Sequence, residues 1–268
     1  MDSNLPQLPI SSETGDALAK PIAESVGNGG EKNFFFFFFF FFFLESVFHF
    51  ALDGLRKYNI RKQYELKKFE EEVKEETDSI PPEHRDDSKI GLVLKAIEDS
   101  RYQLEEEEIR RLFTKLIAAT MDNRKNESVI PIYSSIISNM TPSEAKTLER
   151  IYSNTLSLAP HVRLIAEESD SVSERDLDTS LIIFDWSAES GLEIQLSLLE
   201  VAGLIEFIKD SQLMANQFQR RYELSEKALL EIAEAKNLPL GQNEKFAFRR
   251  SYYRLTSIGK AFCKVVFE

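Results

Sequence analysis

The chain has 268 residues, of which 43% are hydrophobic and 29% charged, so it can build one large or two modest globular domains. Its formal net charge of -12 excludes general attraction to nucleic acid or anionic lipid, and such binding would need a local basic patch. The single cysteine, Cys263, excludes an intrachain disulfide and a cysteine-based zinc site. The N-terminus is acidic and lacks the positive region of a signal peptide, so we expect a cytoplasmic protein that is not secreted.

Residues 1–33 are expected to form a flexible N-terminal tail with a short helix. Pro6, Pro9 and several polar residues indicate disorder at the start, and apolar residues at helical intervals follow in residues 14–27. Pro21 lies inside that interval, where it breaks a helix or begins one. The glycines of "GNGGEKN" predict a flexible hinge before residue 34.

The second segment, 34–77, opens with ten consecutive phenylalanines, Phe34 to Phe43. As a helix, this run and the next leucine reach about 16 Å, against about 30 Å for the hydrocarbon core of a bilayer. A longer helix would place Glu45, His49 and Asp53 in lipid, at roughly 2 to 3 kcal/mol for each charged carboxylate. We therefore expect an apolar cap on an amphipathic helix, in contact with a membrane or a partner but not spanning. The candidate contact residues are Phe34, Phe38, Phe41 and Phe48.

A further interpretation of the phenylalanine run stays open. Ten Phe codons can form a near-homopolymeric T tract, so the run is also a candidate slippage product whose length varies between cells.

The charged helix after the phenylalanine run has a narrow apolar stripe that predicts packing on one neighbour, and it should stop before Pro81 and Pro82.

Residues 88–155 predict a helical core domain. Helices are expected at 89–102, 104–123 and 132–140, the second with a broad apolar face and an acidic first turn. A further helix begins at Thr141, where Thr141, Pro142 and Glu144 stand in the order of a capping box.

Residues 156–268 predict a winged-helix-like module, which gives a mainly α fold overall. The pattern is weak over residues 156–189, and Ser180–Trp186 fits a strand or a buried helix. A helix is expected at 192–202, a glycine cap at Gly203, a strand at 204–208 and a helix at 225–237. A strand that ends at Leu255 and a helix capped by Thr256 complete the module.

This C-terminal part carries a local excess of arginines, the candidate contacts to nucleic acid or a partner. A winged helix uses such residues to grip phosphates. The expected recognition helix at 192–202 carries two glutamates and no basic residue, so a partner protein is favoured over DNA. The candidate residues are Arg220, Arg221, Arg249, Arg250 and Arg254.

No motif of a known enzyme class occurs in the chain. Its three histidines are far apart, and the only metal-like spacing, Glu45, His49 and Asp53, is better explained as the polar stripe of a helix. The acidic runs are typical of solvated helix faces. We therefore assign no catalytic, cofactor-binding or metal-binding residue, and the residues do not argue for an enzyme.

Several of these segments together resemble the Abi-alpha (abortive infection alpha) family of bacterial proteins, over roughly Thr14 to Phe267. The resemblance is strongest in Ile90–Ile151, where Leu116–Asp122 gives a helix ending in A-A-x-M-D and Thr141–Lys146 gives T-P-x-E-A-K. The C-terminal L-T-x-x-G-x-x-F is present at Leu255, Thr256, Gly259 and Phe262. The phenylalanine run departs from the family pattern, where an apolar but mixed segment is expected.

The resemblance implies anti-phage defence inside the infected cell, with no catalytic residues to carry over. The first hypothesis is a non-enzymatic sensor or effector that contacts a phage or host protein, or the surface of a membrane. The alternative is a winged-helix DNA-binding regulator of a defence locus. A homo-oligomer is left open.

Overall fold

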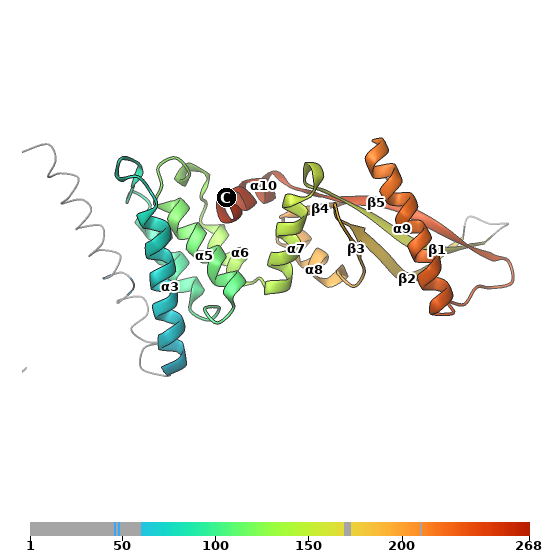
Figure 1. Cartoon of the computed structure of the whole chain (residues 1–268), viewed down its shortest axis with the longest axis horizontal. Helices are drawn as coiled ribbons and strands as arrows, with labels where there is room; N and C mark the ends of the chain where they lie inside the picture. The colour runs from blue at the N-terminus through green and yellow to red at the C-terminus, as the bar shows by residue number, and fades with distance from the viewer. Residues whose placement is uncertain (1–45, 47, 49–59, 169–172, 210) are drawn as a thin grey trace, which may run out of the picture. The chain divides into compact units, whose positions relative to one another are not determined.

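The computed structural model describes residues 46, 48, 60–168, 173–209 and 211–268. The chain divides into two compact units, Met1–Phe50 and Ala51–Glu268. In the first unit, Ser46 and Phe48 are the described residues, and both are helical. All the elements below belong to the second unit (Figure 1).

The helical layer of this unit is built around α5 (Glu107–Thr120), which contacts α3, α4, α6, α7 and α10. Because it has neighbours on most sides, α5 buries side chains around nearly its whole circumference, as a central helix must. Glu107 and Glu108 in its first turn complement the positive end of the helix dipole. The other helices are α3 (Ile60–Asp78), α4 (Ile90–Ser100), α6 (Ile132–Ser138), α7 (Pro142–Ser153) and α10 (Ser257–Phe267), with 3-10 turns η1 (Pro82–His84), η2 (Asn126–Ser128) and η3 (Thr155–Ser157).

Local sequence signals set two boundaries of this layer as predicted. Thr141 and Glu144 form the capping box of α7, and the Thr141 amide donates to Glu144 Oε2 at 2.7 Å. Helix α3 ends at Asp78, ahead of Pro81, whose ring cannot continue a helix.

The C-terminal part forms a five-stranded antiparallel sheet, in the order β3-β2-β1-β5-β4, within the described part of the chain. Its central strand β1 pairs with β2 on one side and along its whole length with β5 on the other, so that His161 lies opposite Ser251, 90 residues later. The elements are β1 (Leu158–Glu168), β2 (Glu174–Ile183), β3 (Ala188–Glu189), α8 (Glu193–Val201), β4 (Ile205–Ile208), α9 (Asn216–Ala235) and β5 (Glu244–Leu255).

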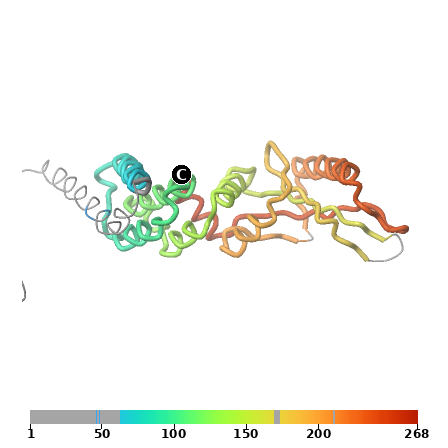
Figure 2. Tube along the Cα trace, turned by 90° about the horizontal axis from the view of Figure 1, so that it is seen from below, coloured from blue at the N-terminus to red at the C-terminus, as the bar shows by residue number. Residues whose placement is uncertain are grey.

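Helix α9 covers one face of the sheet (Figure 2). Side chains alternate between the faces of a strand, so Val162 and Leu164 of β1 pack with Phe218 and Tyr222 of α9. The intervening residues of β1, among them His161 and Arg163, lie on the opposite face.

The expected mainly α class is wrong, because the five-stranded sheet makes the fold α+β. The weak segment 156–189 holds β1 and β2, and β5 pairs with β1 rather than only with β4 as in a two-stranded wing. The winged-helix architecture is therefore not confirmed. The helix expected at 225–237 belongs to α9, which begins at Asn216 and buries Ser225 in its interior.

The junction between β5 and α10 is as predicted, and its L-T-x-x-G motif has a packing role. Thr256 caps α10, since its Oγ1 accepts from the Gly259 amide at 2.9 Å and donates to the Gly203 carbonyl at 2.6 Å. A Cβ on Gly259 would lie 1.9 Å from the Leu204 carbonyl oxygen, so only glycine fits. Gly203 itself has a φ of 73° and ends α8 as expected.

Helix α10 leaves the sheet and packs on α5 and α7, and its Phe262 meets the ring of Tyr133 of α6 edge-on. None of the helices in the part of the chain that the structure describes is both long and apolar enough to cross a membrane.

Candidate functional site

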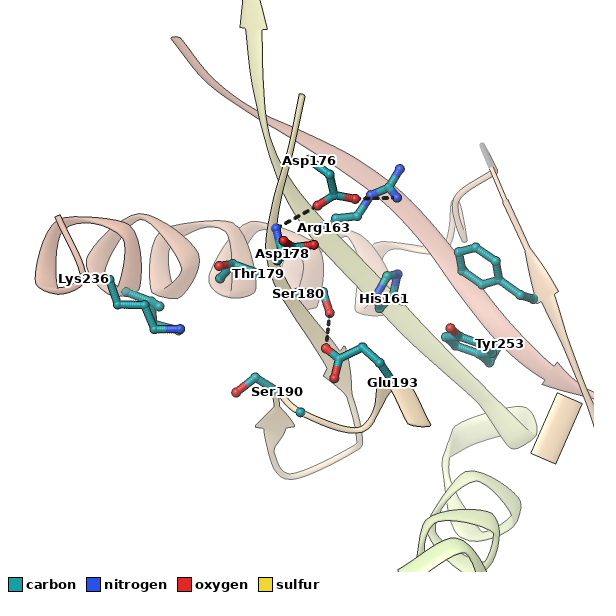
Figure 3. Close-up of a pocket in the computed structure, with 13 residues that line it drawn as sticks. His161, Arg163, Asp176, Asp178, Thr179, Ser180, Ser190, Glu193, Lys236 and Tyr253 are labelled. Carbon is teal, nitrogen blue, oxygen red and sulfur yellow. Dashed lines mark hydrogen bonds and ion pairs between the residues drawn. The ribbon is translucent and has the colours of Figure 1, made fainter. Parts of the chain in front are cut away.

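A cleft of about 600 Å³ lies on the face of the sheet opposite α9 and extends around the outer edge of β2 (Figure 3). The edge is open there because β3 pairs only with Ile182 and Ile183. Residues of β1, β2, β4 and β5, the β3–α8 loop and the end of α9 line the cleft. A volume of this size is within the range of small-molecule sites, roughly 300 to 1,000 Å³.

His161 of β1 is the most buried ionisable group of the cleft, with 9% of its surface exposed. Its Nδ1 lies 2.9 Å from Ser251 Oγ, and the rings of Phe207 and Tyr253 meet it edge-on at centroid distances of 5.6 and 5.7 Å. Burial, with a smaller contribution from the Arg163 charge, lowers the pKa of His161 to about 4. The imidazole is therefore neutral at physiological pH.

The hydrogen bonds of Ser251 favour the tautomer of His161 that has its proton on Nδ1. Ser251 Oγ donates to the His161 carbonyl at 3.4 Å, so it is free to accept from Nδ1–H at 2.9 Å. The lone pair is then on Nε2, which has no partner among the residues described around it.

The charged groups of the cleft are only partly paired. Arg163 forms an ion pair with Asp176 at 2.9 Å, and Ser180 donates to Glu193 at 3.0 Å. Asp178 adopts a positive φ of 48° where the β1–β2 register shifts, so its side chain leaves the regular alternation of the strand. Lys236 lies at the far end of the cleft from His161 (Figure 3).

Groups of three or more histidine, cysteine or carboxylate side chains suited to a metal ion do not occur among the described residues. Glu45, His49 and Asp53 lie outside the described residues, as do Phe34, Phe38 and Phe41. Phe48, the fourth candidate for membrane or partner contact, is 4% exposed.

The structure does not gather the five candidate arginines into one patch. Arg249 and Arg250 are consecutive in β5 and point to opposite faces, Arg249 to Glu174 at 2.8 Å and Arg250 to Glu226 at 2.6 Å. Both border a second cleft of about 470 Å³. The remaining three are Arg221, paired with Asp185 at 2.8 Å, Arg254, paired with Glu206 at 2.8 Å, and Arg220, which is exposed on α9. Their predicted role in binding nucleic acid or a partner stays a prediction.

Helix α8 carries an apolar surface that was not predicted from the sequence. Ile194, Leu198 and Val201 lie on one side of this helix with 72%, 47% and 85% of their surface exposed, and we call these three residues the α8 surface. Trp186, in the turn between β2 and β3, is 97% exposed. Apolar residues at positions i, i+4 and i+7 were the available signal, but a helix that is apolar on most sides is ordinarily read as buried.

The chain matches the family model described as "Abortive infection alpha" over residues 61–266. A search of curated proteins gives no match. Among solved structures, an uncharacterized protein from the hydrocarbon-degrading marine bacterium Alcanivorax borkumensis SK2 is similar, with 17% identity and a TM-score of 0.29 over 51% of this chain and 93% of that one. Since the family match extends over most of its length, the chain belongs to the Abortive infection alpha family.

Proposed function

We propose that the protein acts in abortive infection as a non-enzymatic sensor or effector that works by binding a phage or host protein. Family membership supplies the defence role. The observation that carries the binding role is the exposure of four large apolar side chains, the three of the α8 surface and Trp186.

An exposed group of large apolar side chains is a common mark of a protein-interaction site. Burial of such side chains contributes about 25 cal/mol for each Å² removed from water, and tryptophan is enriched among the residues that dominate binding energy. Trp186 lies in a short turn between β2 and β3, so it is presented to a partner on a well-anchored loop.

The charge around the α8 surface indicates the chemistry of the partner. Glu193 and Glu200 belong to the same helix, and the whole chain has a net charge of -12. A partner with an apolar patch and a basic rim would complement this surface and would be attracted to it over a distance.

The cysteine chemistry of the chain supports a non-enzymatic role. Cys263 is buried in α10, and burial raises the pKa of its thiol, so the thiolate that a nucleophile needs is not formed at physiological pH. His161 has a serine rather than a carboxylate as its side-chain partner, so it lacks the orienting acid of a catalytic triad.

The test is protection of bacteria against a panel of phages. Cells that express the Ile194→Ser and Val201→Ser double variant, or Trp186→Ala, are expected to lose protection by about tenfold or more in plaque counts, as a loss of about 1.4 kcal/mol in binding would give. The matched control is Tyr102→Ala, which removes another exposed aromatic ring (81% exposed) from the helical layer. Full protection by the α8 variants at wild-type protein levels would rule out this surface.

Contact of the phenylalanine run with a membrane or a partner is a separate proposal, motivated by the ten consecutive apolar side chains. Deletion of residues 34–43 is expected to reduce both phage protection and recovery of the protein in the membrane fraction. Equal protection and equal fractionation would remove the run from the mechanism.

A further inference from the structure

We propose that the His161 cleft binds an organic cation that carries N–H donors, a guanidinium or an alkylammonium group. This binding site is distinct from the α8 surface and does not depend on the role proposed for that surface. Three features of the cleft, each independent of the others, select this ligand chemistry.

The first feature is an unpaired hydrogen-bond acceptor at the floor of the cleft. His161 is 9% exposed, its Nδ1–H is used by Ser251, and its Nε2 has no partner within the described structure. Nε2 is not among the buried atoms that lack a partner, so it opens on the cleft and is accessible from there. A ligand N–H group that enters the cleft would donate to Nε2 in place of water.

The second feature is the aromatic wall beside His161. The rings of Phe207 and Tyr253 lie 4.7 Å apart between centroids, and both line the cleft. The π-faces of aromatic rings attract cations, with estimates of about 0.5 to 2 kcal/mol depending on exposure. These rings would leave an anionic ligand without comparable stabilisation.

The third feature is an excess of negative charge where the ligand would lie. The Glu193 charge raises the pKa of both His161 and Tyr253, although burial dominates each shift, so its field reaches both side chains. Asp178 adds a second carboxylate to the lining. The Arg163 charge is offset by Asp176, toward which its guanidinium is turned (Figure 3).

These features also argue against the other ligand classes. An anion would meet Glu193 and Asp178 with one unpaired base, Lys236, at the opposite end of the cleft. A divalent metal ion would find no group of three suitable ligands in the described part of the chain. The cleft is larger than a guanidinium group, so the cation can belong to a free small molecule or to an arginine or lysine side chain of a bound protein.

The test is calorimetric titration of the full-length protein at low ionic strength with N-acetyl-arginine amide and with a short arginine-containing peptide. N-acetyl-citrulline amide, which has the same shape without the charge, is the ligand control. Saturable binding of the arginine compounds, about tenfold or more tighter than that of citrulline, is expected. Tighter binding by the peptide would identify a protein as the source of the cation, and equal binding would identify a small molecule.

Two variants locate the binding. Glu193→Gln removes an exposed charge from the cleft and is expected to weaken arginine binding about fivefold or more, while Glu206→Gln on β4 leaves it unchanged. A shift of the His161 imidazole resonances on titration would place the ligand at Nε2. Equal binding of citrulline, an unchanged affinity of Glu193→Gln, or no saturable binding up to about 10 mM would overturn the proposal.

Discussion

Arg110 in the helical layer and His161 in the sheet are both buried ionisable side chains, and their surroundings differ. Arg110 of α5 is 1% exposed and is held by Glu72 at 3.0 Å, by Glu65 at 3.2 Å and by the Leu104 carbonyl at 2.6 Å. His161 of β1 is 9% exposed, has one hydrogen bond, to Ser251, and directs its second nitrogen to a cleft.

The difference separates a structural ion pair from a site. The carboxylates around Arg110 come from α3, so removal of Arg110 or of either carboxylate disturbs the packing of α3 on α5. The groups around His161 leave room for another molecule, and the second ring nitrogen of His161 faces that cleft. Arg110 also has a buried nitrogen, Nη2, without a hydrogen-bond partner among the described residues, so an unmade hydrogen bond does not by itself mark a site. The open cleft beside His161 is what distinguishes the two side chains.

The largest effect is expected from Arg110→Ala, which would leave Glu65 and Glu72 without their partner at the α3–α5 contact. Breaking a buried ion pair typically costs about 3 to 5 kcal/mol, and we expect about 3 kcal/mol here because both carboxylates keep some contact with water. The measurement is urea unfolding followed by circular dichroism.

The neighbouring residue supplies the control for Arg110. Arg111 also forms an ion pair, with Glu149 at 2.8 Å, but both side chains are well exposed, so Arg111→Ala should cost less than about 1 kcal/mol. Equal losses for the two variants would contradict the structural role of Arg110 and weaken the comparison with His161.

The same contrast explains how far the sequence predicts the fold. In the helical layer the signals are local: the Thr141 capping box, Pro81 and the apolar face of α5 each lie within a few residues of the boundary or surface they determine. In the sheet the paired strands are far apart in the sequence, since β1 pairs with β5 about 90 residues later, and no local pattern predicts that pairing.

The alternation of apolar and polar residues in β1 and β2 is also irregular. The register shift between Leu164 and Ile165 interrupts the apolar alternation, and residues such as Ile182 and Ile183 are buried on both faces of the sheet. His161 was seen only as one of three scattered histidines, because the residues that make it a site, Tyr253 and Glu193, come from β5 and α8.

His161 makes the stability of the protein depend on pH. Its pKa falls from 6.5 to about 4 on folding, so between these values the unfolded chain binds more protons than the folded protein. The neutral imidazole is favourable for folding above pH 6.5, and up to about 3 kcal/mol is lost as the pH falls through this range to 4.

The check is the free energy of unfolding of wild type and His161→Gln at pH 7 and at pH 4.5. Carboxylates titrate in both proteins, so their contribution cancels in the difference. Wild type should lose more stability than the variant between the two values, and parallel losses would show that His161 is not held neutral. An arginine ligand, if it binds Nε2, should lower the pKa of His161 further.

The smallest of these effects is expected at Gly259, where the sheet and the helical layer are joined. A Cβ there would lie 1.9 Å from the Leu204 carbonyl oxygen, so Gly259→Ala must displace the start of α10 and should cost about 1 to 3 kcal/mol, the usual range for overpacking. Gly91 in α4 is the control, because open space surrounds its Cβ position and alanine favours a helix by up to about 1 kcal/mol.

The free energy of unfolding should fall for Gly259→Ala and rise for Gly91→Ala. Such opposite changes would show that Gly259 is required by the close approach of α10 to Leu204, and not by helix propensity. The same measurement distinguishes the two regions, because α10 belongs to the helical core while its cap, Thr256, is bound to the end of α8 through Gly203. If Gly259→Ala loosens this junction, the His161 resonances should stay in place while those of Tyr133, which contacts Phe262, shift. A shift at His161 would instead mean that the cleft and the helical core respond as one body.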